Sequence, residues 1–96
     1  MKDKIKLTRG TVTLTLEPFG QGWCVSASKL IDEFLSTDGN LMRKEKIQMS
    51  IYFKYDIARA SFERGARTMT GAEFHFDDLC QDCFGFTSIE EITYQR

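Results

Sequence analysis

The feature that most constrains this chain is the strict alternation of apolar and polar residues over positions 47–56, IQMSIYFKYD. The apolar members of this row are Ile47, Met49, Ile51, Phe53 and Tyr55. Alternation with period two, carried by β-branched and aromatic residues, is typical of a strand with one buried face. We therefore expect a long strand through Asp56, with the apolar row facing the core.

The first sixteen residues predict a β-hairpin. Aliphatic and polar residues alternate on both sides of Arg9-Gly10, and glycine is suited to a tight turn. Pairing Thr8 with Thr11 would place every aliphatic side chain on one face. A cluster of turn-forming residues at 18–22 ends the second strand, and residues 23–25 can form a short third strand.

Helical spacing appears next in residues 28–35, where Ser28 can serve as the N-cap and the sequence after Asp38 ends the helix. Residues 41–46 then read as a basic connector. Residues 57–69 leave two alternatives open. They form either a helix closed by Gly65 or a hairpin that turns at Arg64-Gly65, and we favour the hairpin because few large apolar residues would anchor a helix.

The C-terminal third predicts helices. Thr70 with Glu73, and Ser88 with Glu91, have the spacing of capping boxes. The first box would open a helix that Gly85 ends with a left-handed residue, and the second would open a short terminal helix. In the alternative reading, residues 74–76 form a short strand and the helix starts at Asp77.

These elements predict one α+β domain over residues 1–96, with a four- or five-stranded antiparallel sheet and helices packed on one face. The composition, 42% hydrophobic and 28% charged, is that of an ordinary globular chain. The sequence has no apolar run long enough for a membrane helix, and its start lacks the apolar segment of a secretory signal. Three cysteines suit free thiols in a reducing compartment, so we expect a cytoplasmic protein.

Charge is divided along the chain. Residues 1–72 carry twelve Lys/Arg against eight Asp/Glu, a net +4, whereas residues 73–96 carry one Arg against six Asp/Glu, a net −5. The two parts should attract each other or offer faces of opposite sign to a partner. The residues chosen as candidate partner contacts are the acidic Glu73, Asp77, Asp78 and Asp82 and the basic Arg59, Arg64 and Arg67.

Cys80 and Cys83 form a C-x-x-C pair, which with His75 and Cys24 could supply four zinc ligands or, alternatively, a redox dithiol. Because the pair lies within an apolar helical stripe, we favour buried structural thiols and expect no metal or cofactor. Adjacent carboxylates such as Asp77 and Asp78 point in different directions on a helix, so they cannot act as an acid/base pair. We therefore expect no enzymatic activity.

The sequence favours a small protein-binding domain that acts as an inhibitor or adaptor by occluding a larger protein or ribonucleoprotein complex. A phage- or plasmid-encoded anti-defence inhibitor, such as an anti-CRISPR protein, is the concrete form of this hypothesis. The alternative is a small RNA-binding module that uses the basic residues together with Tyr52 and Tyr55. Pairing of an exposed edge strand could also join two copies into a dimer.

Overall fold

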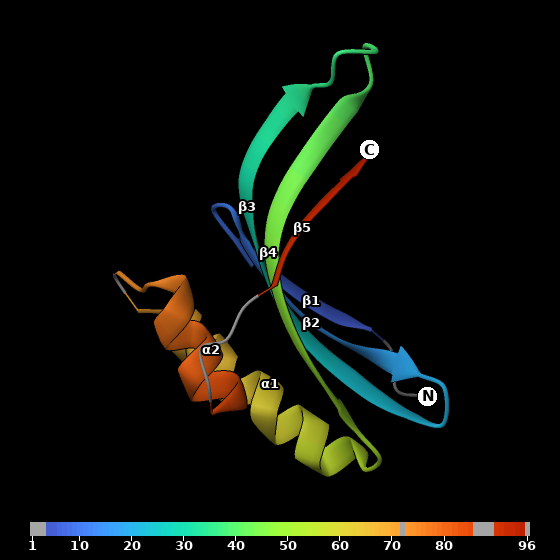
Figure 1. Ribbon diagram of the computed structural model, residues 1–96. Helices are drawn as coiled ribbons and strands as arrows, with labels where there is room; N and C mark the ends of the chain where they lie inside the picture. The colour runs from blue at the N-terminus through green and yellow to red at the C-terminus, as the bar shows by residue number, and fades with distance from the viewer. Residues whose placement is uncertain (1–3, 72, 86–89, 96) are drawn as a thin grey trace.

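The computed structural model describes residues 4–71, 73–85 and 90–95. Along the chain, the elements are β1 (Ile5–Arg9), β2 (Val12–Phe19), β3 (Gly22–Leu35), β4 (Leu41–Tyr52), α1 (Tyr55–Met69), α2 (Phe76–Phe84) and β5 (Glu90–Gln95). The strands form one antiparallel sheet in the order β1-β2-β3-β4-β5, and both helices pack on one of its faces (Figure 1). The predicted α+β architecture is confirmed. Neither described helix is long and apolar enough to cross a membrane.

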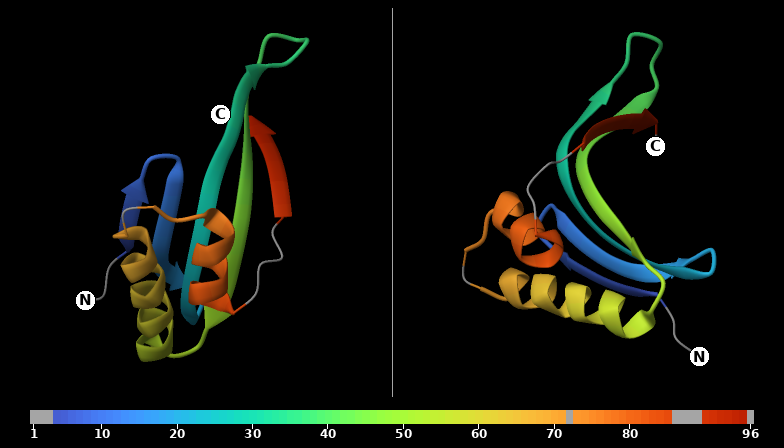
Figure 2. Two further views of the ribbon diagram at one scale, coloured as in Figure 1. Left: turned by 90° about the vertical axis from the view of Figure 1, so that its left-hand side faces the viewer. Right: turned by 60° about the horizontal axis from the view of Figure 1, so that its bottom comes forward.

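The sheet is strongly curved along β3 and β4, and the helices lie against its convex side (Figure 2). The pairing of β3 with β4 shifts between Leu30 and Asp32, so that Ile31 is an extra residue opposite consecutive residues of β4. A bulge of this kind bends the strand that carries it. Beyond the bulge, the β3–β4 hairpin extends past both helices (Figure 1). We call this part, residues 31–43, the arm.

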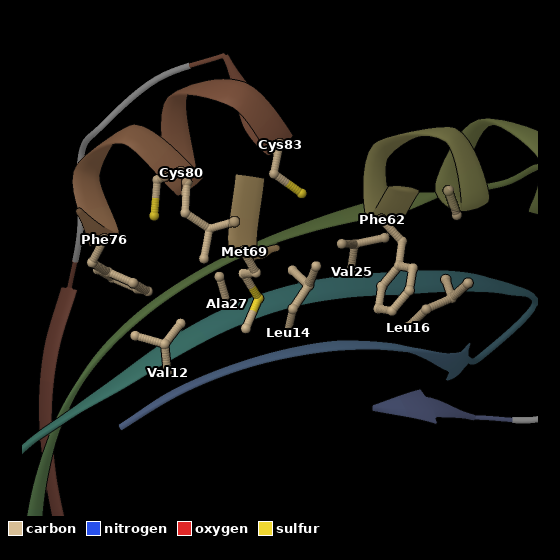
Figure 3. Packing of buried hydrophobic residues seen from close by; sticks show 12 residues of the cluster. Val12, Leu14, Leu16, Val25, Ala27, Phe62, Met69, Phe76, Cys80 and Cys83 are labelled. Carbon is tan, nitrogen blue, oxygen red and sulfur yellow. The ribbon is translucent and has the colours of Figure 1, made fainter. Parts of the chain in front are cut away.

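The core fills the space between the convex face and the two helices (Figure 3). Alternate residues of β2 point into it, and pairing places Leu14 beside Ala27 and Leu16 beside Val25 of β3. The helices complete the core with Ala58, Ser61, Phe62, Met69, Phe76, Leu79, Cys80 and Cys83. Burial of this apolar surface is the main force that holds the layers together.

The two helices approach β2 most closely around Gly65. A Cβ atom at this position would lie 2.8 Å from Cδ2 of Leu14 and 3.3 Å from Sγ of Cys83. Next to it, the Ser61 hydroxyl donates a hydrogen bond to the Cys83 carbonyl at 2.8 Å, and the Cys83 thiol donates one to the Ser61 carbonyl at 3.1 Å. These bonds join α1 to α2 and satisfy polar groups that are cut off from water.

The N-terminal hairpin is present, but its predicted register is wrong by two residues. Thr8 pairs with Thr13, and the turn is Gly10-Thr11, with Gly10 at a φ of 61°. Because the shift is an even number of residues, each side chain keeps the face that the alternation predicted.

Residues 28–35 are a strand and not the predicted helix, and residues 41–46 belong to β4 and do not form a connector. The pattern at 28–35 resembles a helical stripe, but these residues pair with β4 up to Leu35. Tertiary pairing therefore overrides the local pattern, as it often does in strands.

The preferred hairpin for residues 57–69 is also wrong, because these residues form α1. The expected anchors of a helix were Ile57, Ala58 and Phe62, and the buried face of α1 adds Ser61, Gly65 and Met69 to the last two of them. Thr70 does not open a helix but is the C-cap of α1, and α2 begins only at Phe76.

At the C-terminal end, Gly85 ends α2 with a φ of 84°, as predicted. The expected terminal helix is instead the strand β5, which pairs with β4. Ser88, its expected cap, lies outside the described residues.

Candidate functional site

The members of the alternating row that belong to β4, Ile47, Met49 and Ile51, lie on the face opposite the core, so this part of the prediction is wrong. Phe53 follows the end of β4, and Tyr55 lies in α1 and packs against the core. The register of β4 is set by β3, and it places Ser50 opposite Val25 and Gln48 opposite Ala27. Because Val25 and Ala27 face the helices, Met49 and its alternate neighbours point to the concave side. β4 also ends at Tyr52, so the strand does not reach Asp56.

The exposure of the row is large. The exposed fractions are 52% for Met49, 49% for Ile51 and 90% for Phe53. Tyr52 instead packs against the core from the other face of β4, and its hydroxyl donates a hydrogen bond to Ser61 Oγ at 3.2 Å.

A further aromatic residue extends this surface onto the β2–β3 turn. Phe19 shares a face with Glu17, away from the helices, and it is 58% exposed. Its partner Gly22 touches the end of β4, since a Cβ there would lie 2.4 Å from the Tyr52 carbonyl oxygen. The turn and the end of β4 are thus in contact at one end of the concave face. We call the set formed by Phe19, Met49, Ile51 and Phe53 the foot patch.

A second apolar set lies on the arm, at the other end of the same face. Leu35 and Leu41 are direct partners in the β3–β4 pairing, and the alternation of β4 places them on the concave side. Leu35 is 70% exposed and Leu41 is 40% exposed. We call these two residues the tip patch.

Two ion pairs lie on the concave face, and Lys6, which pairs with Thr15 in the β1–β2 register, is exposed on the same face. Lys4 lies 3.4 Å from Glu17, and Arg43 lies 2.6 Å from the buried carboxylate of Glu45. The Tyr94 hydroxyl also donates a hydrogen bond to Glu45, and burial together with this carboxylate raises the pKa of Tyr94. The strands β2 and β3 add hydroxyl groups from Thr13, Thr15, Ser26 and Ser28. The face therefore offers apolar and hydroxyl groups more than free charge.

The predicted charged contacts lie elsewhere, on the two helices. On α1, Arg59 bonds to Glu63 and to the Tyr55 hydroxyl, both at 2.9 Å, and these partners raise the pKa of Arg59. Arg64, Arg67 and Asp82 line a common hollow between α1 and α2. Within it, Arg64 donates a hydrogen bond to the Asp82 carbonyl at 3.2 Å.

The acidic candidates also stand beside cations of the same chain. Asp77 shares a hollow with Lys29 and Lys46, and Glu73 shares another with Arg9 and Lys29. Asp78 is exposed on α2. This arrangement favours the view that the two halves of opposite charge attract each other. It leaves the seven residues scattered over the helical layer and does not gather them into one contact surface.

All three cysteines are free and buried, as the apolar stripe around Cys80 and Cys83 predicted for that pair. Cys24 lies next to Val25 on the opposite face of the sheet from Cys80 and Cys83. Burial raises the pKa of Cys24 and Cys83, and burial, with Asp77 and Cys83 nearby, raises the pKa of Cys80 to about 12. These thiols therefore stay protonated near neutral pH. No three metal-binding side chains converge anywhere in the described part of the chain.

Comparison with protein-family models, with curated proteins and with solved structures finds no match.

Proposed function

We propose that this chain is a non-catalytic protein-interaction domain that uses its concave face to occlude a surface of a larger partner. The observation that carries the proposal is the foot patch, where the end of β2 and the end of β4 expose large apolar side chains at the same end of the sheet. Exposed apolar patches of this kind usually mark interaction sites on globular proteins.

The size of the foot patch supports this function. Its exposed fractions correspond to about 500 Å² of accessible apolar side chain, when a full side chain exposes about 200 Å². The largest patch on a typical monomer is about 300–600 Å² and is often functional. A partner with an apolar, convex and uncharged contact surface would fit this curved face (Figure 2).

The chemistry of the concave face favours a protein over a nucleic acid. Binding to nucleic acid draws on several unneutralised Lys or Arg side chains, whereas on this face Lys4 and Arg43 are paired with carboxylates and Lys6 is the exposed cation without an ion pair among the described residues. The RNA-binding alternative would use Arg59 and Arg64 on α1, where Glu63 neutralises Arg59, whereas Arg64 donates a hydrogen bond to the backbone carbonyl of Asp82 and keeps its charge. We propose a cytoplasmic partner, and an inhibitor of anti-CRISPR type remains the concrete form of the proposal.

Affinity capture from a host-cell lysate, with and without nuclease, tests the proposal. We expect one stoichiometric protein partner that survives nuclease treatment and is lost with Met49→Lys or Phe53→Lys. The matched control is Ile57→Lys, because Ile57 is an apolar α1 residue with a similar exposed fraction, 54%.

Charge reversals test the other readings. Loss of the partner with Asp77→Lys and Asp82→Lys, but not with Phe53→Lys, would move the contact to the helical layer. Recovery of RNA that disappears with Arg59→Glu and Arg64→Glu would overturn the proposal in favour of the RNA-binding alternative.

A further inference from the structure

We propose that a second copy of this chain covers the two apolar patches at the ends of the concave face when no other partner is bound. In this two-fold dimer, the tip patch of each copy packs on the foot patch of the other. The inference rests on the proposed function, because it assigns a second occupant to the same interaction face.

The first argument is the placement of the two patches. They lie at opposite ends of one curved face, because Leu35 and Leu41 are on the arm and the foot patch is at the other end of β4 (Figure 2). A two-fold axis between two facing concave surfaces brings the tip of each copy to the foot of the other. The same contact then occurs twice, and the assembly closes without exposing another apolar surface, as two-fold dimers do.

The second argument is area. The tip and foot patches together expose about 700 Å² of apolar side chain per copy, counted at about 200 Å² for a full side chain. A stable protein interface of standard size buries about 800 Å² per partner. The polar groups at the rim of the patches can supply the remaining area, so the two patches are large enough for a specific dimer.

The third argument is charge, and it selects tip-to-foot over tip-to-tip contact. The loop at the end of the arm carries Asp38, whose carboxylate accepts hydrogen bonds from Ser36 and Asn40 that lower its pKa and keep it ionised. Lys54 follows Phe53 at the foot and is exposed. Tip-to-foot contact brings these opposite charges together, whereas tip-to-tip contact would bring two Asp38 carboxylates together.

The fourth argument is that the arm lacks a covering layer. The helices stop short of it (Figure 1), although β4 pairs with β5 up to Met42. Phe34, on the other face of the arm, is also 39% exposed. A second copy would give the concave side of the arm the apolar cover that a sheet face normally has.

Analytical ultracentrifugation of the full chain tests the dimer. We expect a concentration-dependent species of twice the 11.1 kDa chain mass. Leu35→Glu and Met49→Lys should each raise the dimer dissociation constant at least about 30-fold, because each places an unpaired charge in both contacts. Ile57→Lys should leave the constant unchanged. Circular dichroism of each variant separates loss of the dimer from loss of the fold.

The double variant Leu35→Glu/Met49→Lys identifies the geometry. In the proposed dimer it pairs Glu with Lys in both contacts, so we expect it to regain most of the lost affinity and to weaken with added salt. The combination Leu35→Glu/Ile57→Lys has the same charge and should stay monomeric.

Three results would overturn the inference: a wild-type chain that stays at 11.1 kDa at all concentrations, equal loss with Ile57→Lys and Met49→Lys, or a double variant without recovery. If the wild-type chain is monomeric but still captures a partner through Phe53, the dimer inference is wrong and the proposed function stands. If the double variant restores the dimer but the chain captures no partner, the dimer inference stands and the proposed function is wrong.

Discussion

Two phenylalanines nine positions apart give the sharpest test of which face of the sheet is buried. Phe53 belongs to the alternating row and is 90% exposed, whereas Phe62 on α1 is 6% exposed. The same substitution, Phe→Ala, can therefore be made at both positions. The sequence pattern alone predicts that Phe53 is a core residue, so that its replacement would strongly lower the free energy of unfolding. The structure predicts that its replacement has little effect.

The magnitudes follow from the exposed fractions. Replacing a fully buried phenylalanine with alanine lowers the free energy of unfolding by about 3–5 kcal/mol. Phe62→Ala should cost this full amount, because almost its whole side chain leaves water on folding. Phe53 buries only about a tenth of its side chain, so Phe53→Ala should cost about 0.3–0.5 kcal/mol.

Urea unfolding followed by the fluorescence of Trp23 measures both costs. Trp23 is the only tryptophan, and its ring meets the Tyr55 ring edge-on at 4.8 Å, so it reports on contact between β3 and the start of α1. With a slope of about 1.5 kcal/mol/M, Phe62→Ala should lower the midpoint by about 2–3 M and Phe53→Ala by about 0.2–0.3 M. The measurement is made at low protein concentration, so that self-association does not contribute to the urea midpoints.

A loss above about 2 kcal/mol for Phe53→Ala would refute the exposed position of Phe53 on which the foot patch depends. A small loss for Phe62→Ala would refute the packing of α1 on the sheet. Equal losses at the two positions would refute both.

Two further predictions concern the interior. Gly65→Ala should lower the melting temperature, because overpacking against Leu14 costs about 1–3 kcal/mol and the gain in helix propensity returns only about 1 kcal/mol; a higher melting temperature would contradict the close contact. The buried thiols should make stability fall as pH rises from 9 toward 12, since unfolded cysteines lose protons that the folded chain keeps. Urea midpoints at pH 7 and pH 10 measure this fall, which Cys80→Ala should reduce; an unchanged slope would show that Cys80 does not contribute.

Much of the fold follows from local sequence signals. The alternation in residues 5–16 gave the correct faces of β1 and β2, because side-chain direction depends only on parity. Gly85 was identified as a helix end, because a left-handed residue strongly favours glycine. These signals depend on few neighbours, and for that reason they can be found without a structure.

The candidate site could not be predicted in this way. Period two at residues 47–56 correctly indicates a strand over most of its length, but it does not say which face the helices cover. That choice is made by Val25 and Ala27 on β3, through pairs that join residues far apart in sequence. The small residues of α1 concealed the buried stripe of the helix, so the layer that covers the convex face was itself missed.

The bulge at Ile31 has a consequence for how this surface could change through evolution. Leu30 and Asp32 already face opposite sides of the sheet, as neighbours in a regular strand do, so loss of the intervening residue would keep every side chain of the arm on its present face. What would change is the bend, and with it the distance that separates the arm from the end of β4. Insertion or loss of one codon at the bulge can thus change the distance between the arm and the end of β4, and so fit the concave face to a different partner, without altering any residue that makes contact.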